Sequence, residues 1–330
     1  MNGRRRVLIV LGATALAPRA VLAQAKPAPV LIGWLNSDSR ESSGHYLTAF
    51  KEGLAALGWT EGAQYVIEER WADGRNARLP SLAEELAAKK PAVIVAAPLQ
   101  SVPAAAKAAP KAPIVMATGN DPVAAGLVKS LARPGGMITG LTNFNVTLTE
   151  KYLDLLLAAA PKVKRVGVLG DPNAGTAGTY TLLKEAVRRS VTQYQVEARF
   201  AEAGSSEEIE PAISRLAKEG AQALVVMLSP MLRVERRRIV KLALAQRWAV
   251  VAGAGEFAEA GALLSYNADA VANYRRAAYY VDRILKGANP GDLPIEQSTK
   301  FELAINLKTA KALGLTMPQS LMLQADKVIE

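Results

Sequence analysis

Residues suited to catalysis or metal binding are few in this chain of 330 amino acids, and they lack the spacing of reactive motifs. The sole histidine is His45, and no G-x-S-x-G nucleophile motif accompanies it. After the apolar run at 30–35, the first predicted strand, no glycine occurs until Gly44, so the G-x-G-x-x-G pattern of dinucleotide sites is missing there. The chain also has no G-K-[ST] loop. The chain has no cysteine, and its carboxylates show no metal-ligand spacing. We therefore expect no catalytic residue, no metal and no cofactor.

Polar loops at the ends of apolar runs are the remaining candidates for function. In open α/β sheets, ligands bind at the carboxyl ends of the strands, where helix N-termini offer free N–H groups to a carboxylate. Taken singly, Gln100 and Asp121 would serve equally well as helix caps, so the collection of loops is the stronger signal. The candidate ligand-binding residues are Asn36, Ser37, Gln100, Ser101, Asn120, Asp121, Phe144, Asn145, Asp171, Asn173, Ser229 and Glu256.

The strands that must position these loops are short apolar runs rich in Val and Ile. Runs of this length bounded by Gly and Pro are typical of buried parallel strands, and their starts are roughly 20–35 residues apart, which is the βα repeat distance. We therefore predict an α/β fold with two successive parallel sheets of similar construction. The predicted strands are 30–35, 65–68, 92–97, 114–118 and 138–141 in the first sheet, and 165–170, 195–200, 223–228, 249–252 and 263–266 in the second.

Helix signals occur between these runs. Ser43 precedes a helical stripe of apolar residues that ends at Gly58. Asp121 and Pro122 have the cap residue and first-turn proline of a further helix. Both helices would begin at the carboxyl end of a strand.

The order of the elements predicts a signal peptide and two lobes that face each other across a cleft. The chain should cross between the lobes near Phe144 and Tyr266. The predicted bounds are 1–25 for the signal peptide, 26–145 together with a helix at about 268–290 for lobe 1, and 146–265 for lobe 2, with a C-terminal segment at about 295–330 whose lobe the sequence leaves open.

The N-terminus has the layout of a secretory signal peptide. Arginines at positions 4–6 form a basic region, residues 7–16 form an apolar run, and small residues follow at Ala23 and Ala25. The apolar run is too short to span a bilayer. We expect export to the periplasm with cleavage near Ala23 or Ala25, by either the general or the twin-arginine route.

The formal net charge of +10 raises nucleic acid as a partner. The positive residues are dispersed, however, and the densest group, at 233–241, has no aromatic residue among its charges. On one continuous helix Arg233, Arg237 and Lys241 would share a face, so we interpret this group as a solvated helix surface. We expect a monomer with no nucleic-acid or membrane partner.

Eight segments spread over nearly the whole mature chain resemble the tryptophan/tyrosine-type group of ABC-transporter substrate-binding proteins. The most specific of them is TKFELAINLKTAKALGL at 299–315. The others are IGWL at 32–35, FKEGLAALGW at 50–59, IEERWADGR at 67–75, DPV at 121–123, LARPGG at 131–136, RRRIV at 236–240 and YRRAA at 274–278.

This resemblance implies the type I periplasmic binding protein fold, with two Rossmann-like lobes joined by a hinge. It implies capture of a small molecule, with amino acids and aromatic acids as candidates, and delivery to an inner-membrane permease with its ATPase. For an amino acid, the ammonium would pair with Asp121 or Glu256. The segments 253–256 and 266–267 depart from the family pattern beside the expected cleft, so the resemblance leaves the ligand open.

Two other functions remain open from the sequence. A secreted two-domain α/β enzyme, such as a hydrolase or isomerase acting through carboxylates, would turn over a substrate in the same cleft. The ligand-sensing module of a signalling system would bind a solute there but would contact a different partner. Genes for a permease and an ATPase next to this one would favour transport over both.

Overall fold

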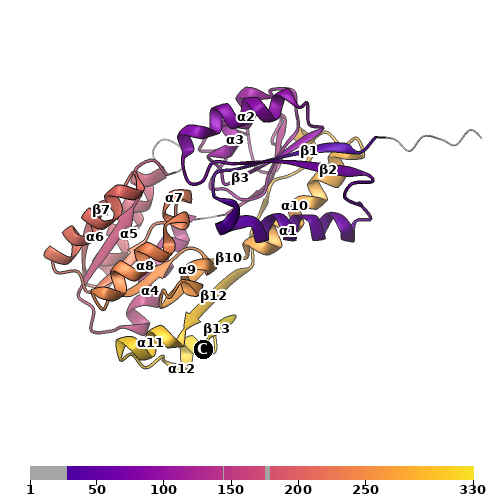
Figure 1. The fold of residues 1–330 in the computed structure, drawn as a ribbon. Helices are drawn as coiled ribbons and strands as arrows, with labels where there is room; N and C mark the ends of the chain where they lie inside the picture. Colours follow the sequence, from indigo (N-terminus) through magenta and orange to yellow (C-terminus); the bar gives the residue numbers. More distant parts are fainter. Residues whose placement is uncertain (1–27, 144, 175–178) are drawn as a thin grey trace, which may run out of the picture.

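The computed structural model describes residues 28–143, 145–174 and 179–330, which form two α/β lobes (Figure 1). The predicted signal peptide and the predicted crossing residue Phe144 lie outside these ranges. Every apolar run predicted to be a strand contains or overlaps one. The predicted α/β class with two parallel-dominated sheets is therefore confirmed. In the described ranges, no helix is long and apolar enough to cross a membrane.

Lobe 1 is built on a six-stranded parallel sheet with the order β11-β5-β4-β3-β1-β2. Its central strands are buried along their whole length, as expected for strands covered on both faces. Helices α1 and α10 pack on one face, and α2 and α3 pack on the other. The elements are β1 (Val30–Asn36), α1 (Arg40–Ala56), β2 (Tyr65–Trp71), η1 (Asn76–Arg78), α2 (Leu79–Ala88), β3 (Val93–Ala97), α3 (Ser101–Ala108), β4 (Ile114–Met116), β5 (Ile138–Thr142), α10 (Ala270–Leu285), η3 (Pro290–Asp292) and β11 (Glu296–Gln297).

Lobe 2 has a seven-stranded sheet with the order β13-β12-β10-β9-β8-β6-β7, parallel except where β12 runs antiparallel to β10. Helices α4 and α5 pack on one face, and α6, α8 and α9 pack on the other. The elements are α4 (Asn145–Ala159), β6 (Arg165–Gly170), α5 (Thr179–Gln193), β7 (Glu197–Glu202), η2 (Ser206–Glu208), α6 (Ile209–Lys218), β8 (Ala223–Val226), α7 (Pro230–Val234), α8 (Arg236–Ala245), β9 (Ala249–Ala252), α9 (Gly255–Glu259), β10 (Leu264–Ala268), β12 (Phe301–Asn306), α11 (Leu307–Leu313), α12 (Gln319–Met322) and β13 (Lys327–Ile329).

The chain crosses between the lobes three times, after β5, after β10 and between β11 and β12. Helix α10 lies beside α1 of lobe 1, although it follows lobe 2 in the sequence (Figure 1). The C-terminal segment divides, because β11 pairs with β5 whereas β12 and β13 extend the sheet of lobe 2. Asn143 Oδ1 accepts hydrogen bonds from Asn273 Nδ2 at 3.1 Å and from Ser298 Oγ at 2.6 Å, so one cluster ties the three crossings together.

Two helix starts differ from those predicted. Ser39, not Ser43, is the N-cap of α1, because Ser39 and Ser42 each accept a hydrogen bond from the other's backbone N–H, at 3.1 and 3.3 Å. The residues after Asp121 form a turn rather than a helix. The chain reverses there at Gly126, whose φ of +69° is incompatible with a continuing helix.

Candidate ligand-binding site

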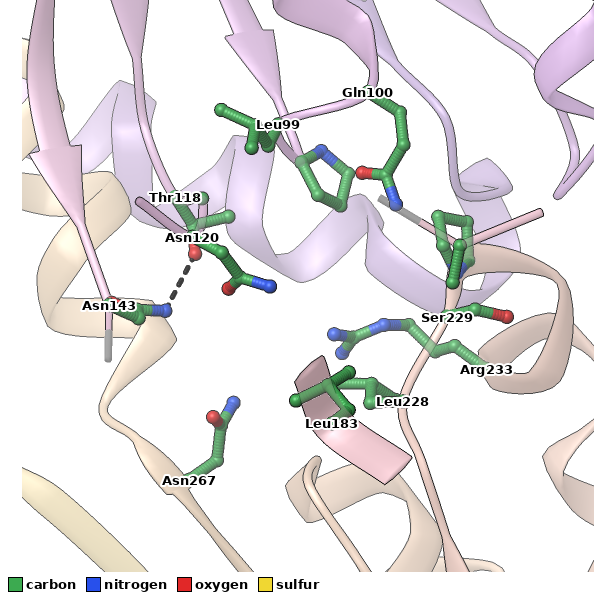
Figure 2. A pocket seen from close by; sticks show the side chains of 14 residues that line it. Leu99, Gln100, Thr118, Asn120, Asn143, Leu183, Leu228, Ser229, Arg233 and Asn267 are labelled. Carbon is green, nitrogen blue, oxygen red and sulfur yellow. Dashed lines mark hydrogen bonds between the residues drawn. The ribbon is translucent and has the colours of Figure 1, made fainter. Parts of the chain in front are cut away.

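A pocket between the lobes is formed where the carboxyl ends of the two sheets face each other (Figure 2). Its empty volume, with the solvent at its mouth included, is about 620 Å³. Its described wall combines apolar side chains and four amides with a single charged side chain. The lining residues are Pro98, Leu99, Gln100, Thr118, Gly119, Asn120 and Asn143 from lobe 1, and Ala174, Leu183, Leu228, Ser229, Pro230, Arg233 and Asn267 from lobe 2.

The charged side chain of the wall is Arg233, which α7 positions. This short helix begins directly after β8, where Ser229 Oγ accepts a hydrogen bond from Leu232 N at 3.2 Å and a proline occupies the first helical position. The Arg233 side chain is 9% exposed. Figure 2 shows its guanidinium pointing into the pocket toward Asn120.

The interpretation of residues 233–241 as one solvated helix face is wrong for Arg233. The chain does not form one continuous helix here, because α7 ends at Val234 and α8 starts at Arg236. This break separates Arg233 from Arg237, whose side chain is 74% exposed. The first turn after β8 therefore places Arg233 in the pocket, whereas Arg237, beyond the break, lies in solvent.

Arg233 also belongs to a buried cluster that joins the lobes, here called the interlobe cluster: Asp38 and Tyr46 from lobe 1, Arg233 and Glu256 from lobe 2. Arg233 Nη1 donates to Glu256 Oε1 at 3.0 Å and to the Tyr46 hydroxyl at 3.3 Å. The Tyr46 hydroxyl donates to the same carboxylate oxygen at 2.8 Å. Arg233 Nε lies 3.5 Å from Asp38 Oδ2, so the cluster bridges the two lobes.

The two carboxylates that share this guanidinium have pKa values shifted in opposite directions. Burial raises the pKa of Asp38, and the opposing effects of Arg233 and the Ser43 hydroxyl do not cancel it. Burial also acts to raise the pKa of Glu256, but the charge of Arg233, a backbone N–H and the Tyr46 hydroxyl together lower it. Since the pKa of Glu256 is lowered while that of Asp38 is raised, we assign the ion pair to Arg233 and Glu256.

Buried polar atoms without a hydrogen-bond partner gather at the same place. Among the described residues they include Asn36 Nδ2, Ser37 Oγ and Asp38 Oδ1 at the end of β1. Arg233 Nε and Glu256 Oε2 are further examples on lobe 2. Each unpaired buried group costs about 1–3 kcal/mol. Of the residues that carry these atoms, Arg233 lines the pocket.

Six of the residues predicted to bind ligand lie together at the interface of the lobes. Three of them line the pocket, and three lie in or beside the interlobe cluster. Their contact with a ligand stays a prediction. They are Gln100, Asn120 and Ser229, and Asn36, Ser37 and Glu256.

Ser101 and Asp121 have local roles. The Ser101 hydroxyl donates to the carbonyl of Ala97 at 3.0 Å at the start of α3. Asp121 is exposed, and its Oδ1 accepts hydrogen bonds from the backbone N–H groups of Val123 and Ala124 at 3.1 and 3.0 Å. Neither side chain lines the pocket.

Asp171 and Asn173 lie at the carboxyl end of β6. Asp171 is buried, which raises its pKa, and its Oδ1 accepts from Asn173 N at 2.8 Å. The Asn173 carbonyl accepts from Asn76 Nδ2 at 3.3 Å, a contact between the lobes at the rim of the pocket. Phe144 and the side chain of Asn145 lie outside the described part of the chain.

Three members of the interlobe cluster were not predicted from the sequence. For Arg233 a signal exists, because Ser229 and Pro230 form a helix start directly after a strand, so the first turn must face the strand end. Asp38 lies in a polar loop already considered for binding. Tyr46 sits in the apolar stripe of α1, where nothing distinguishes it from a core residue.

Comparison with known proteins gives one matching family model. Residues 36–329 match the model described as ABC transporter substrate binding protein. A curated relative, the Tyrosine-binding protein of Clostridioides difficile (strain R20291), is 26% identical over 266 residues. That alignment covers 81% of this chain and 75% of the relative.

Two solved structures with similar folds differ in their bound state. An ABC domain from Streptococcus pneumonia in complex with L-Trp is 24% identical, with a TM-score of 0.83 over 92% of this chain and 100% of that chain. The ligand-free, open structure of a substrate binding protein with adhesive properties from Clostridium difficile is 25% identical, with a TM-score of 0.66 over 91% and 99%.

Proposed function

From its membership of the family of ABC transporter substrate-binding proteins, to which this chain belongs, we propose that it captures a carboxylate-bearing solute of the amino-acid class. The observation that carries this proposal is the wall of the pocket. It holds one guanidinium, four amides and apolar side chains, and no carboxylate among the described lining residues. Such a wall attracts a carboxylate, because guanidinium and carboxylate form paired, charge-assisted hydrogen bonds.

The rest of the pocket suits the remainder of an amino acid. Leu99, Leu183 and Leu228 provide an apolar surface for a side chain, and the amide oxygens of Asn120 and Asn267 can accept hydrogen bonds from an ammonium. The names of the tyrosine-binding relative and of the L-Trp complex support an aromatic amino acid as the first candidate. The family is one of solute-binding proteins and not an enzyme class.

We infer that the lobes are arranged here as in the closed state. Buried contacts between them support this, with Arg233 Nε 3.5 Å from Asp38 Oδ2 and the Tyr46 hydroxyl donating to Glu256. The two solved structures support it too, because they cover similar shares of this chain at similar identity, yet the open one superposes less well. A rotation of one lobe against the other would produce that difference. Ligand would favour closure because only the closed form offers it contacts from both lobes.

Delivery to an inner-membrane permease with its ATPase, after export to the periplasm, completes the proposed function. The basic, apolar and small-residue regions of residues 1–25 support export. N-terminal sequencing of protein recovered from the periplasm tests it. A chain that still begins at Met1 would contradict export through a cleaved signal peptide.

Calorimetric titration with L-tryptophan and L-tyrosine tests the pocket. Arg233→Gln is expected to weaken binding by roughly tenfold or more, because a charge-assisted hydrogen bond to the ligand is lost. Arg237→Gln is the matched control, since Arg237 also forms a salt bridge between the lobes, 3.1 Å from Glu41, but does not line the pocket. Equal affinity of wild type and Arg233→Gln for every amino acid that binds would contradict the proposal.

A further inference from the structure

A second cavity lies between the lobes, next to the pocket described above; we call it chamber 2. Its empty volume is about 580 Å³. Asn267 lines both cavities, and the interlobe cluster lies between them, with Arg233 facing the first pocket and Tyr46 and Glu256 facing chamber 2. Helices α1 and α10 form the wall from lobe 1. A solute in chamber 2 would therefore contact both lobes.

The charge of chamber 2 is opposite to that of the first pocket. Three carboxylates line it, from Glu256, Glu259 and Glu302. Lys327 is paired with Glu259 at 2.7 Å, and Arg233 is paired with Glu256 at 3.0 Å. In the described part of the chain Glu302 forms no salt bridge, and burial and the nearby charge of Asp269 raise its pKa more than the charges of Lys327 and Lys300 lower it. One carboxylate of the wall thus has no compensating cation in contact.

A second observation points to a ligand in this cavity. The Glu256 side chain is only 8% exposed, and its Oε2 is buried without a hydrogen-bond partner among the described residues. Further acceptors in the wall are the Ser265 hydroxyl and the Asn267 amide oxygen. The pKa of His45, at the rim, is lowered mainly by burial, so its imidazole is neutral near pH 7 and does not supply the missing cation.

These acceptors suit an organic cation better than a metal ion. The described residues contain no group of three or more His, Cys, Asp or Glu placed to hold a metal. A primary ammonium carries three N–H donors, which matches a wall of separated carboxylate, hydroxyl and amide oxygens.

We propose that chamber 2 is a binding site for a primary organic ammonium, separate from the carboxylate pocket at Arg233. The proposal goes beyond the amino-acid function and does not depend on it. Since the chamber is walled by both lobes, an amine bound there favours the closed form. By linkage, it also tightens the binding of a solute in the first pocket.

The test is titration with n-butylammonium as the probe and 1-butanol as its neutral counterpart, followed by calorimetry or ligand-observed NMR. Wild type is expected to bind the ammonium and not the alcohol. Glu302→Gln and Glu256→Gln are each expected to weaken ammonium binding by roughly tenfold or more, because each loses a charge-assisted contact. Glu210→Gln, an exposed acid on α6 outside the chamber, is the matched control and should bind like wild type.

Arg233→Gln separates this proposal from the proposed function. It should lose affinity for L-tryptophan yet bind n-butylammonium as tightly as wild type or more tightly, since the Glu256 charge loses its partner. Thermal melts check that each variant is folded. If Glu302→Gln is unfolded, Glu256→Gln serves as the test variant in its place. No binding of the ammonium to wild type, equal binding to both folded glutamine variants, or equal binding of 1-butanol would overturn the proposal.

Discussion

Asp121 holds its carboxylate against its own backbone. Its Oδ1 accepts hydrogen bonds from Val123 N and Ala124 N, and the side chain is exposed outside the pocket. We therefore expect Asp121→Asn to keep both the affinity for L-tryptophan and the melting temperature, because Asn caps a turn about as well as Asp. Asp121→Ala should lower the free energy of unfolding by about 1 kcal/mol through loss of the cap.

Calorimetric titrations and thermal melts of the two variants beside wild type decide the role of Asp121. A loss of affinity in Asp121→Asn at unchanged melting temperature would mean that the carboxylate contacts the ligand after all. The comparison isolates the effect of the charge, because Asp and Asn have nearly the same size and shape.

At the scale of elements, the contact between α1 and α10 holds lobe 1 to a helix that follows lobe 2 in the sequence. Gly53 permits it: a Cβ there would lie 2.5 Å from the carbonyl oxygen of Arg275 and 2.8 Å from the Cβ of Ala278. Because backbone blocks the space, Gly53→Ala should force the helices apart and lower the free energy of unfolding by about 1–3 kcal/mol.

Gly44 provides the matched control on the same helix. The nearest atom to an added Cβ is Arg40 Cγ at 3.6 Å, an ordinary contact with a flexible side chain. Gly44→Ala should therefore raise the free energy of unfolding by roughly 0.5–1 kcal/mol, because alanine loses less conformational freedom in a helix than glycine. Urea unfolding measures both variants, and equal effects at the two positions would contradict the close packing of α1 on α10.

At the scale of the whole molecule, closure buries Asp38 against Arg233 of the other lobe and raises its pKa above the ordinary value of 3.8. An acid whose pKa is raised in the native state stabilises that state below its ordinary pKa, and the contribution is lost as pH rises through the raised value. Asn cannot titrate. Asp38→Asn should therefore gain free energy of unfolding relative to wild type between about pH 4 and about pH 7.

Urea unfolding of both proteins at the two pH values measures this difference. Glu256 and His45 titrate in wild type and variant alike, so their contributions largely cancel in the comparison. An unchanged difference between the two proteins across that range would show that Asp38 keeps an ordinary pKa. The lobes would then be further apart in solution than in the structure described here.

The sequence alone determined strands β1 to β10, the two lobes and the ends of the sheets at which the predicted binding residues lie. Those features are local: a run of Val and Ile bounded by Gly or Pro forms a buried strand whatever lies elsewhere in the chain. Asn36, Gln100, Asn120 and Ser229 could be selected because each lies directly after a predicted strand or in the loop that follows one. Their type and place in the chain suffice to bring them to one edge of a sheet.

Only the tertiary structure decided which charges meet between the lobes. Tyr46 and Glu256 are 210 residues apart in sequence, and their hydrogen bond depends on how three crossings orient one lobe against the other. The position of the Arg233 side chain depends on the break between α7 and α8. Glu235 alone forms this break, in a stretch whose sequence pattern predicts a single helix. Burial and charge pairing between distant segments are properties of the packed molecule, so no local pattern encodes them.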